Sequence, residues 1–595
     1  MSGHWQGRMN RRRLVGGAAG GGLALALGSR MAGEQSSRYA MPGLIRAQQG
    51  AANIPTPRDQ TLVIEQLTTN VWDSFNAFIP NGDAYNYGIS QLARENMFYA
   101  NFVTGEIKPW LATKYEYNDD FTECTLHLNP KVKWSDGQPW TAEDVVFSQE
   151  LLRKNPQLNG ATGYVESVES ISAPDAHTVV WKLTHAQPRF HYRFYAGVIC
   201  DGVQVVPKHI WEKEDPGTFK DNPPVRTGPY TLQESSSSKL YYLWKKNPDY
   251  WNIDEMNPAP EYIIFLQATS PDTSVQEFLN GNTDVTYVDI VDYLNQQVIM
   301  SQMDKTVQNI FADPCPRGFY FNSDSPSGLF SKPEGRWAIS HLIDRETIAT
   351  TISQPASRPA HLPWADYEGW KKWAPDEIVN KYDFSYDPDR ANQLLDAMGS
   401  TRDGDVRTLN GKPLQLTMIC PMPTNNPMFE IGQTMARAAA DVGLQIEQKS
   451  LPGSAFWDTY ALGEYDISNH WLCGMEYDPI QVFGGFSSNN YKPVGTRVNS
   501  GGDQGSARFQ NADFDKLIDQ LEAISPDSPD AKPLYDKTLD LYLTELPSCP
   551  SIEQVAPMLY NTTYFTGWPT TENQETIPAS WWGGFLFTIG NLTKA

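Results

Sequence analysis

Apolar and polar residues alternate along several short stretches of the chain. Between residues 124 and 134, Leu126, Leu128, Val132 and Trp134 keep one parity, and the segment HTVVWKLTH repeats the pattern. Because successive side chains of a strand point to opposite faces, this alternation predicts half-buried strands. The segment YTLQESSSSKLYYLW predicts two further strands joined by a serine-rich turn.

Two longer stretches combine strand and helix patterns. Residues 261–290 predict a strand, a helix that ends at Gly281, and a second strand at Val285. Residues 414–448 predict the same order of elements, with Gly443 ending the helix. Strands that alternate with helices in this way are typical of α/β lobes, and the sequence shows neither an internal repeat nor a heptad pattern.

The stretch VKWSDGQPWTAEDVVFSQELL, residues 132–152, contains a helix start signal. Thr141 and Asp144 have the spacing of a capping box, in which each side chain satisfies a backbone N–H at the helix start. Glu143 and Asp144 also suit the positive end of the helix dipole. We therefore assign these carboxylates to helix capping rather than to a catalytic pair.

Chain length and charge narrow the class of protein. A chain of 595 residues is too long for one hydrophobic core, so we expect two or three lobes. The formal net charge of −23 would repel phosphate backbones and anionic lipids. We therefore expect no nucleic-acid partner.

The N-terminus predicts export. Residues 11–13 are arginines, and the uncharged run at residues 16–29 is shorter than the roughly 20 residues that span a bilayer. The paired arginines favour the twin-arginine route, so residues 1–52 are predicted to be a signal peptide and leader, with a membrane anchor as the alternative. The first cysteine is Cys124, so no lipid-bearing cysteine follows the run. These features predict a periplasmic protein that is not lipid-anchored.

The sequence carries no motif for catalysis or cofactor binding. It contains no HExxH, GxSxG or Walker A motif, and its nine histidines and six cysteines show no ligand spacing. We therefore expect no catalytic residues, no metal site and no cofactor. Abundant carboxylates leave a glycosidase pair open as an alternative, although nothing in the sequence favours it.

Aromatic residues are frequent, and several lie among polar neighbours. The chain has 18 Trp, 28 Tyr and 25 Phe, which together make up 12% of its residues. Flat rings pack against sugar rings or peptide side chains, while nearby amides and carboxylates bind hydroxyls or amides. Core packing is the alternative for each ring. The aromatic candidates for ligand contact are Trp72, Phe75, Trp457 and Trp471.

The segment TLHLNPKVKWSDGQPWTAEDVVFS resembles the signature of the family 5 extracellular solute-binding proteins, the oligopeptide, nickel and oligosaccharide binders of ATP-binding-cassette (ABC) importers. The similarity continues, in order, through VVPKHIWE, VRTGPYTL, KNPDYWN, RGFYFNSDSP, RWAISHLIDRETIA, DPDRANQLLDAMG, GEYDIS and NADFDKLIDQLEA. These segments cover most of the chain from about residue 62 onward.

The resemblance implies an α/β, periplasmic-binding-protein-like fold (type II, cluster C-like), in which a hinge joins two lobes and an additional subdomain is present. Lobe I would contain residues 53–87, 222–310 and 548–595, the additional subdomain residues 88–221, and lobe III residues 311–547. Hinge closure would bury an extended solute between lobes I and III and present it to a membrane permease. We expect a monomer that breaks no bond. An exported glycoside hydrolase and a binding protein without a transporter are the alternatives.

The ligand class rests on the segment WLCGMEYDP. Peptide-binding members of the family often hold the peptide amino group with an aspartate four residues before a proline. Counting back from Pro479 leads to Met475, which cannot pair with an ammonium group, and Glu476 follows. With Asp478, these two residues complete the candidate site. The departure from the peptide pattern and the loop aromatics favour an oligosaccharide, with an oligopeptide as the alternative.

Overall fold

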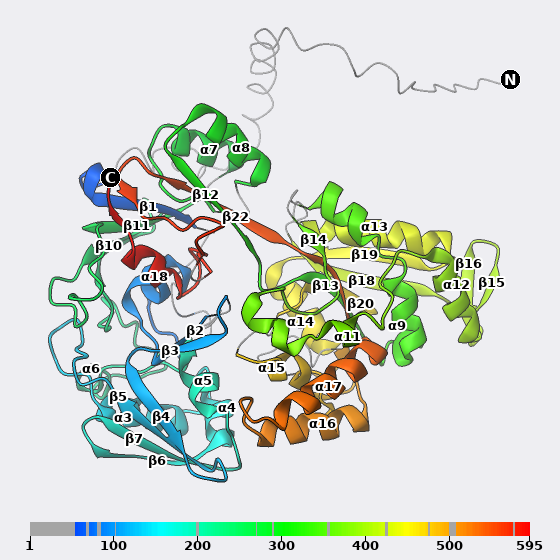
Figure 1. The fold of residues 1–595 in the computed structure, drawn as a ribbon, viewed down its shortest axis with the longest axis horizontal. Helices are drawn as coiled ribbons and strands as arrows, with labels where there is room; N and C mark the ends of the chain where they lie inside the picture. The colour runs from blue at the N-terminus through cyan, green and yellow to red at the C-terminus, as the bar shows by residue number, and fades with distance from the viewer. Residues whose placement is uncertain are drawn as a thin grey trace, which may run out of the picture.

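Two bodies joined by a ribbon of two strands make up the protein in the computed structural model (Figure 1). One body contains lobe I and the additional subdomain, and the other is lobe III. No helix in the described part of the chain is long and apolar enough to cross a membrane. The predicted leader lies outside that part. The structure describes residues 54–66, 71–79, 82, 85–101, 103–197, 202–268, 270–287, 291–353, 357–422, 427–473, 477–498, 507–574 and 577–595.

Lobe I is built around a four-stranded sheet. Its elements are η3 (Arg58–Gln60), β1 (Thr61–Gln66), β9 (Tyr230–Ser236), β10 (Tyr241–Lys246), β11 (Tyr262–Gln267), α7 (Pro271–Leu279), α8 (Tyr293–Gln302), β23 (Phe565–Thr566), α18 (Phe585–Gly590) and β24 (Thr593–Lys594). The sheet order is β1-β11-β10-β9, and β9 and β10 form the predicted hairpin. The second strand expected at Val285 is reduced to single bridges with Ile64 and Tyr560.

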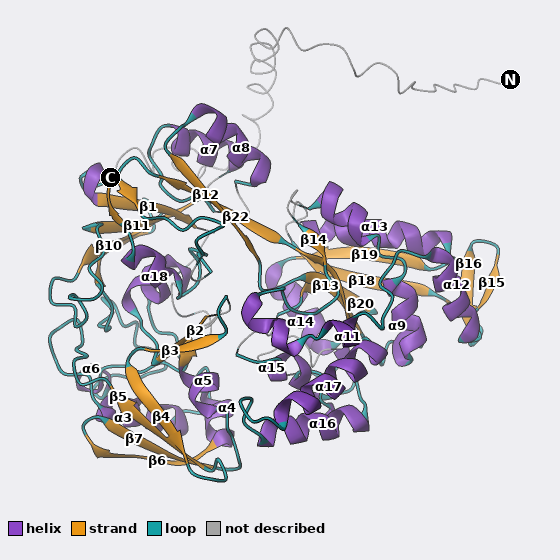
Figure 2. Cartoon of the chain, viewed as in Figure 1, coloured by secondary structure: helices purple, strands orange, loops and turns teal. Residues whose placement is uncertain are grey.

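The additional subdomain is dominated by strands (Figure 2). Its elements are η4 (Tyr85–Ala93), β2 (Phe98–Asn101), β3 (Glu106–Pro109), β4 (Ala112–Tyr117), β5 (Glu123–Leu128), α3 (Ala142–Lys154), α4 (Ala161–Ser167), β6 (Val168–Asp175), β7 (Thr178–Leu183), α5 (Phe190–Tyr195), β8 (Ala196–Gly197) and α6 (Lys208–Trp211). The predicted alternation is confirmed in β5 and β7, whose apolar residues face one core. The strand prediction extended too far, because β5 ends at Leu128 and a turn carries Val132 and Trp134 into the same core.

The helix start predicted within residues 132–152 is confirmed. Thr141 is the N-cap of α3, and both halves of the capping box are present. The Asp144 carboxylate accepts a hydrogen bond from the Thr141 backbone N–H at 2.9 Å. It also accepts one from the Lys208 backbone N–H at 3.0 Å, so the cap joins α3 to α6.

Lobe III is built around a six-stranded sheet. Its elements are β13 (Arg317–Phe321), η5 (Leu329–Ser331), α9 (Pro333–Ser340), α10 (Arg345–Thr347), η6 (Ile348–Ile352), β14 (Arg358–Pro359), η7 (Glu368–Trp373), α11 (Asp376–Val379), α12 (Pro388–Ala397), β15 (Thr401–Asp403), β16 (Val406–Leu409), β17 (Lys412–Pro413), β18 (Gln415–Pro421), α13 (Pro427–Asp441), β19 (Gln445–Leu451), α14 (Gly453–Leu462), β20 (Ile467–Trp471), α15 (Ile480–Gly484), η8 (Ser488–Asn490), α16 (Ala512–Ala523), α17 (Ala531–Glu545) and β21 (Ser548–Glu553). The sheet order is β14-β21-β13-β20-β18-β19. The predicted strand, helix and strand of residues 414–448 are confirmed, since β18 and β19 pair in parallel with α13 between them.

The two bodies are joined by an antiparallel ribbon of β12 (Thr306–Ala312) and β22 (Val555–Asn561). β21 lies directly before β22 in the chain, yet it pairs with β13 and β14 of lobe III. This pairing differs from the expected boundary, which gave residues 548–553 to lobe I. We therefore place the start of the last lobe I segment after Glu553. Figure 1 shows β12 and β22 crossing from one body to the other, where a hinge is expected.

Candidate functional site

The aromatic candidates of lobe I lie around β10. Trp72 is half-buried and stacks on Tyr242, with ring centroids 4.9 Å apart and planes at 7°. Phe75 has no exposed surface and packs edge-on against Tyr242 and Trp244. The Phe75 ring therefore lies in the core in this structure, and its contact with ligand stays a prediction. Trp72 stays a candidate.

The aromatic candidates of lobe III lie at α14 and at the end of β20. Trp457 is 40% exposed and packs edge-on against His470, with ring centroids 5.8 Å apart. Trp471 is the last residue of β20, and the guanidinium carbon of Arg317 lies 5.8 Å from its ring centroid. No ring contact joins these two tryptophans in the described part of the chain. Trp457 thus packs against β20 and Trp471 ends it, but the two rings do not form a continuous aromatic surface.

The side chain beside Trp457 carries no charge at neutral pH. His470 is fully buried, and burial lowers its pKa to about 3. A neutral imidazole provides no cation for a carboxylate group of a ligand. The ring neighbours of Trp457 among the described residues are therefore uncharged, and Phe456 and Tyr460 are the other two besides His470.

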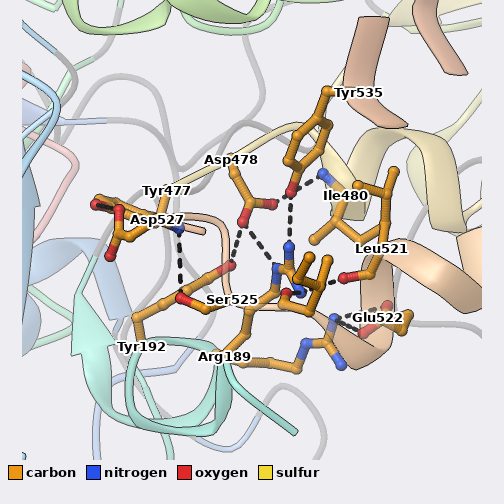
Figure 3. Close-up of polar contacts among 12 residues, drawn as sticks. Arg189, Tyr192, Tyr477, Asp478, Ile480, Leu521, Glu522, Ser525, Asp527 and Tyr535 are labelled. Carbon is orange, nitrogen blue, oxygen red and sulfur yellow. Dashed lines mark hydrogen bonds and ion pairs between the residues drawn. The ribbon is translucent and has the colours of Figure 1, made fainter. Parts of the chain in front are cut away.

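The segment expected to decide the ligand class is described only in part. Met475 and Glu476 lie outside the described residues, so their roles stay predictions. Asp478 is described, and its side chain has no exposed surface. Its carboxylate forms an ion pair with Arg189 at 2.8 Å and accepts hydrogen bonds from the Tyr192 hydroxyl at 2.8 Å and the Ile480 backbone N–H at 3.0 Å (Figure 3).

Asp478 therefore departs from the expectation that it contacts ligand. Its oxygen atoms are already used by partners within the protein, and a carboxylate so enclosed cannot also accept a peptide ammonium group without losing them. The physical reason is that the partner of Asp478 comes from a distant part of the chain. Arg189 belongs to the additional subdomain and Asp478 to lobe III, so the pair joins the two bodies.

Arg189 is enclosed by lobe III (Figure 3). Its guanidinium also donates to the backbone carbonyls of Leu521 at 2.6 Å and Ile524 at 2.9 Å, and to the Tyr535 hydroxyl at 2.7 Å. Burial alone would lower the pKa of Arg189, but the nearby Asp478 carboxylate raises it, so the side chain stays charged. We call the pair of Arg189 and Asp478 the interlobe ion pair.

A second contact joins the additional subdomain to lobe III. The Gly369 backbone N–H of η7 donates to the Val103 carbonyl, at the tip of the hairpin of β2 and β3, over 3.1 Å. A Cβ atom added to Gly105 would lie 3.0 Å from the Gly369 backbone, so the two chains approach closely. The two bodies are therefore in contact at the hairpin of β2 and β3 as well as at the interlobe ion pair.

Sequence reasoning missed the interlobe ion pair. Arg189 stands in AQPRFHYRFY, a stretch that holds four aromatic residues and two arginines, and Asp478 stands just before Pro479. Nothing in the sequence indicates that these two residues, 289 positions apart, meet.

The sequence of this chain is similar to those of known solute-binding proteins. Residues 106–493 match the bacterial extracellular solute-binding proteins, family 5, middle region. The periplasmic oligopeptide-binding protein of Salmonella typhimurium is 25% identical over 461 residues, which cover 73% of this chain and 77% of that protein.

Solved structures show the same fold. A periplasmic oligopeptide-binding protein of an oligopeptide ABC transporter from Thermotoga maritima is 25% identical and has a TM-score of 0.79, with 91% of this chain and 100% of that chain covered. The mannohexaose-bound structure of the Thermotoga maritima protein has a TM-score of 0.74 at 25% identity, with 91% and 99% covered. The expected α/β fold is thereby confirmed. The family match spans more than half of the residues, so the chain belongs to family 5 of the bacterial extracellular solute-binding proteins.

Proposed function

We propose that this protein is the solute-binding component of an ABC importer, and that it captures an extended oligosaccharide between lobes I and III. In this proposal the bodies close about the ribbon of β12 and β22, and the closed form presents the ligand to a membrane permease. The protein acts as a periplasmic monomer, exported by the twin-arginine route, and needs no cofactor. Its family membership and its two-body architecture support this function.

The burial of Asp478 is the observation that carries the preference for an oligosaccharide. A peptide brings a charged amino group and a charged carboxylate, and each needs a partner of opposite charge when it is buried. Asp478 already forms an ion pair with Arg189, and His470 beside Trp457 is neutral. The exposed face of Trp457 and the ring of Trp471 suit the C–H faces of sugars.

An oligopeptide is the second candidate. The Salmonella typhimurium relative is named for oligopeptides, and so is the Thermotoga maritima protein that was solved with mannohexaose. Glu476 stands one position from the place expected of the aspartate that holds a peptide amino group. Such a glutamate would serve this role, and the ligand panel must therefore contain both classes.

The test is a thermal unfolding screen of the mature protein. Mannohexaose, cellohexaose and xylohexaose are compared with tri- to hexapeptides, because a ligand at about 100 times its Kd adds about 2.7 kcal/mol to the unfolding free energy. Stabilisation by a saccharide and not by peptides supports the proposal. Stabilisation by peptides alone would replace it with the second candidate.

The same incubations separate a binding protein from an exported hydrolase. Chromatography of the saccharides after prolonged contact should show unchanged chain lengths. Steady shortening that a carboxylate variant abolishes would refute transport binding as the function.

A further inference from the structure

A cavity lies where the additional subdomain meets the C-terminal end of lobe I, outside the lobe III surface that carries Trp457 and Trp471. Its volume is about 530 Å³. Cavities of a few hundred Å³ are typical sites for small molecules. The cavity is lined by Tyr99, Glu106 and Trp110 of the hairpin of β2 and β3, by Glu255, and by Gly584 and Phe587 in the region of α18. We call it the hairpin cavity.

Three rings form a corner of the hairpin cavity. Phe587 meets Tyr99 edge-on at 4.9 Å and Trp110 edge-on at 5.3 Å between ring centroids. Tyr99 and Trp110 are themselves edge-on at 6.0 Å. Phe587 is half-buried, whereas the other two rings are buried. Rings packed at right angles hold one another in place, so this corner presents fixed apolar surface.

A buried carboxylate fixes Trp110 from behind. Glu95 accepts hydrogen bonds from the Trp110 indole N–H at 2.7 Å, the Tyr250 hydroxyl at 2.7 Å and the Trp251 indole N–H at 2.9 Å. Burial raises the pKa of Glu95, and these hydrogen bonds oppose the shift. A buried carboxyl group is costly unless it is hydrogen-bonded, and here the hydrogen bonds also set the orientation of two indoles. Such support behind a ring is typical of a preorganised binding site.

The polar groups of the hairpin cavity mix donors and acceptors. Three amides and two carboxylates line it, and the Lys108 ammonium lies 4.4 Å from the Phe587 ring centroid and 5.1 Å from that of Trp110. A ligand cation would compete with Lys108 for these ring faces, and a ligand anion would meet Glu106 and Glu255. A neutral molecule that has apolar C–H faces and many hydroxyls fits both the rings and the polar groups.

We propose that the hairpin cavity is a second binding site, which takes one or two rings of a neutral saccharide. The Val103 carbonyl at the tip of the same hairpin accepts the hydrogen bond from Gly369 of lobe III. A saccharide held against β2 and β3 therefore lies beside the contact that closes the two bodies. The site does not depend on the ligand class of the surface between lobes I and III.

Gly584 offers a way to block the cavity without disturbing the fold. Its backbone, at φ −60° and ψ −15°, suits any residue, and a Cβ atom there would meet no other heavy atom within 4 Å. Gly584→Leu therefore fills part of the cavity. Phe587→Ala removes one ring of the corner, and Trp457→Ala in lobe III is the control for the other surface.

The experiment is calorimetric titration of the full mature protein with mannobiose, cellobiose, xylobiose and chitobiose. We expect at least one disaccharide to bind, with roughly tenfold weaker affinity in both Gly584→Leu and Phe587→Ala, which is about the contribution of one aromatic contact. Circular dichroism melts check that each variant is folded. Trp457→Ala should leave this affinity unchanged even if it abolishes mannohexaose binding.

Three results would overturn the proposal. They are the absence of binding by all four disaccharides, unchanged binding in folded Gly584→Leu and Phe587→Ala, and loss of disaccharide binding in Trp457→Ala alone. Dipeptide binding that Gly584→Leu abolishes would also overturn the assignment to saccharides. The function proposed for the surface between lobes I and III can fail independently, since Gly584→Leu and Phe587→Ala alter the hairpin cavity whereas Trp457→Ala alters the other surface.

Discussion

Asp478→Asn tests whether the interlobe ion pair holds the two bodies closed. The substitution keeps the shape of the side chain but removes the charge that Arg189 meets at 2.8 Å, where the two side chains are 0% and 2% exposed. Removing one partner of a buried ion pair costs about 3–5 kcal/mol, because the other charge is left buried without compensation. Here the protein has an alternative to unfolding. When the bodies separate, water can solvate Arg189.

The substitution therefore raises the free energy of the closed form relative to that of the open form. At 1.4 kcal/mol for each factor of ten, about 3 kcal/mol lowers the ratio of closed to open molecules by about 100-fold. Because apparent affinity falls with the fraction of molecules competent to bind, ligand affinity should fall by up to the same factor. The overall unfolding free energy should change much less than the closure equilibrium.

Small-angle X-ray scattering of the free protein and calorimetry with its best ligand measure the two effects. The radius of gyration should rise in Asp478→Asn, and Arg189→Met combined with Asp478→Leu should recover the closed form, since apolar groups of similar size replace such pairs well. The control is Glu522→Gln, because the neighbouring pair of Arg193 and Glu522 is about one-third exposed and such pairs contribute about 0–1 kcal/mol. Unchanged scattering and affinity in Asp478→Asn would refute the reasoning.

Three further predictions concern single side chains. Trp471→Ala should weaken saccharide binding while the melting temperature stays near that of the unaltered protein, and equal affinity by calorimetry would remove this ring from the site. Thr141→Ala should lower the unfolding free energy by about 1 kcal/mol in a urea titration, because it removes half of the capping box of α3. Burial raises the pKa of Glu65 to about 7, so the folded state binds more protons than the unfolded state between about pH 4.5 and 7, and stability falls as pH rises through this range. Glu65→Gln should therefore raise the unfolding free energy by up to about 3 kcal/mol at pH 8 and by little at pH 4, and an equal effect at both values would contradict this assignment.

Local sequence signals predicted several of the elements in this fold. The alternation in β5 and β7 and the serine hairpin of β9 and β10 depend on neighbours in the chain, and all of them are present. The capping box of α3 is equally local. The strand expected at Val285 is reduced to bridges, because its pairing depends on two distant strands. The boundary near residue 548 was misplaced for the same reason, since β21 gains its partners only in the folded sheet.

Side-chain roles in the candidate site were less predictable. Phe75 and Trp72 occur in the same polar stretch, and only the packing of β10 places one in the core and the other at its margin. Asp478 stands in the segment that suggested ligand contact, but Arg189 from another lobe occupies its carboxylate. A sequence pattern records which residue types are present, and it contains no distance between residues 189 and 478.

By itself the sequence determined the α/β class, the helix and strand units and the family, because each depends on periodicity, capping or the order of motifs along the chain. The tertiary structure alone decided which aromatic rings are buried, which carboxylate joins the two bodies, and where the hairpin cavity lies. The physical reason is that burial and ion pairing are set by groups far apart in the chain. Desolvation and charge, which control binding, act through distance in space.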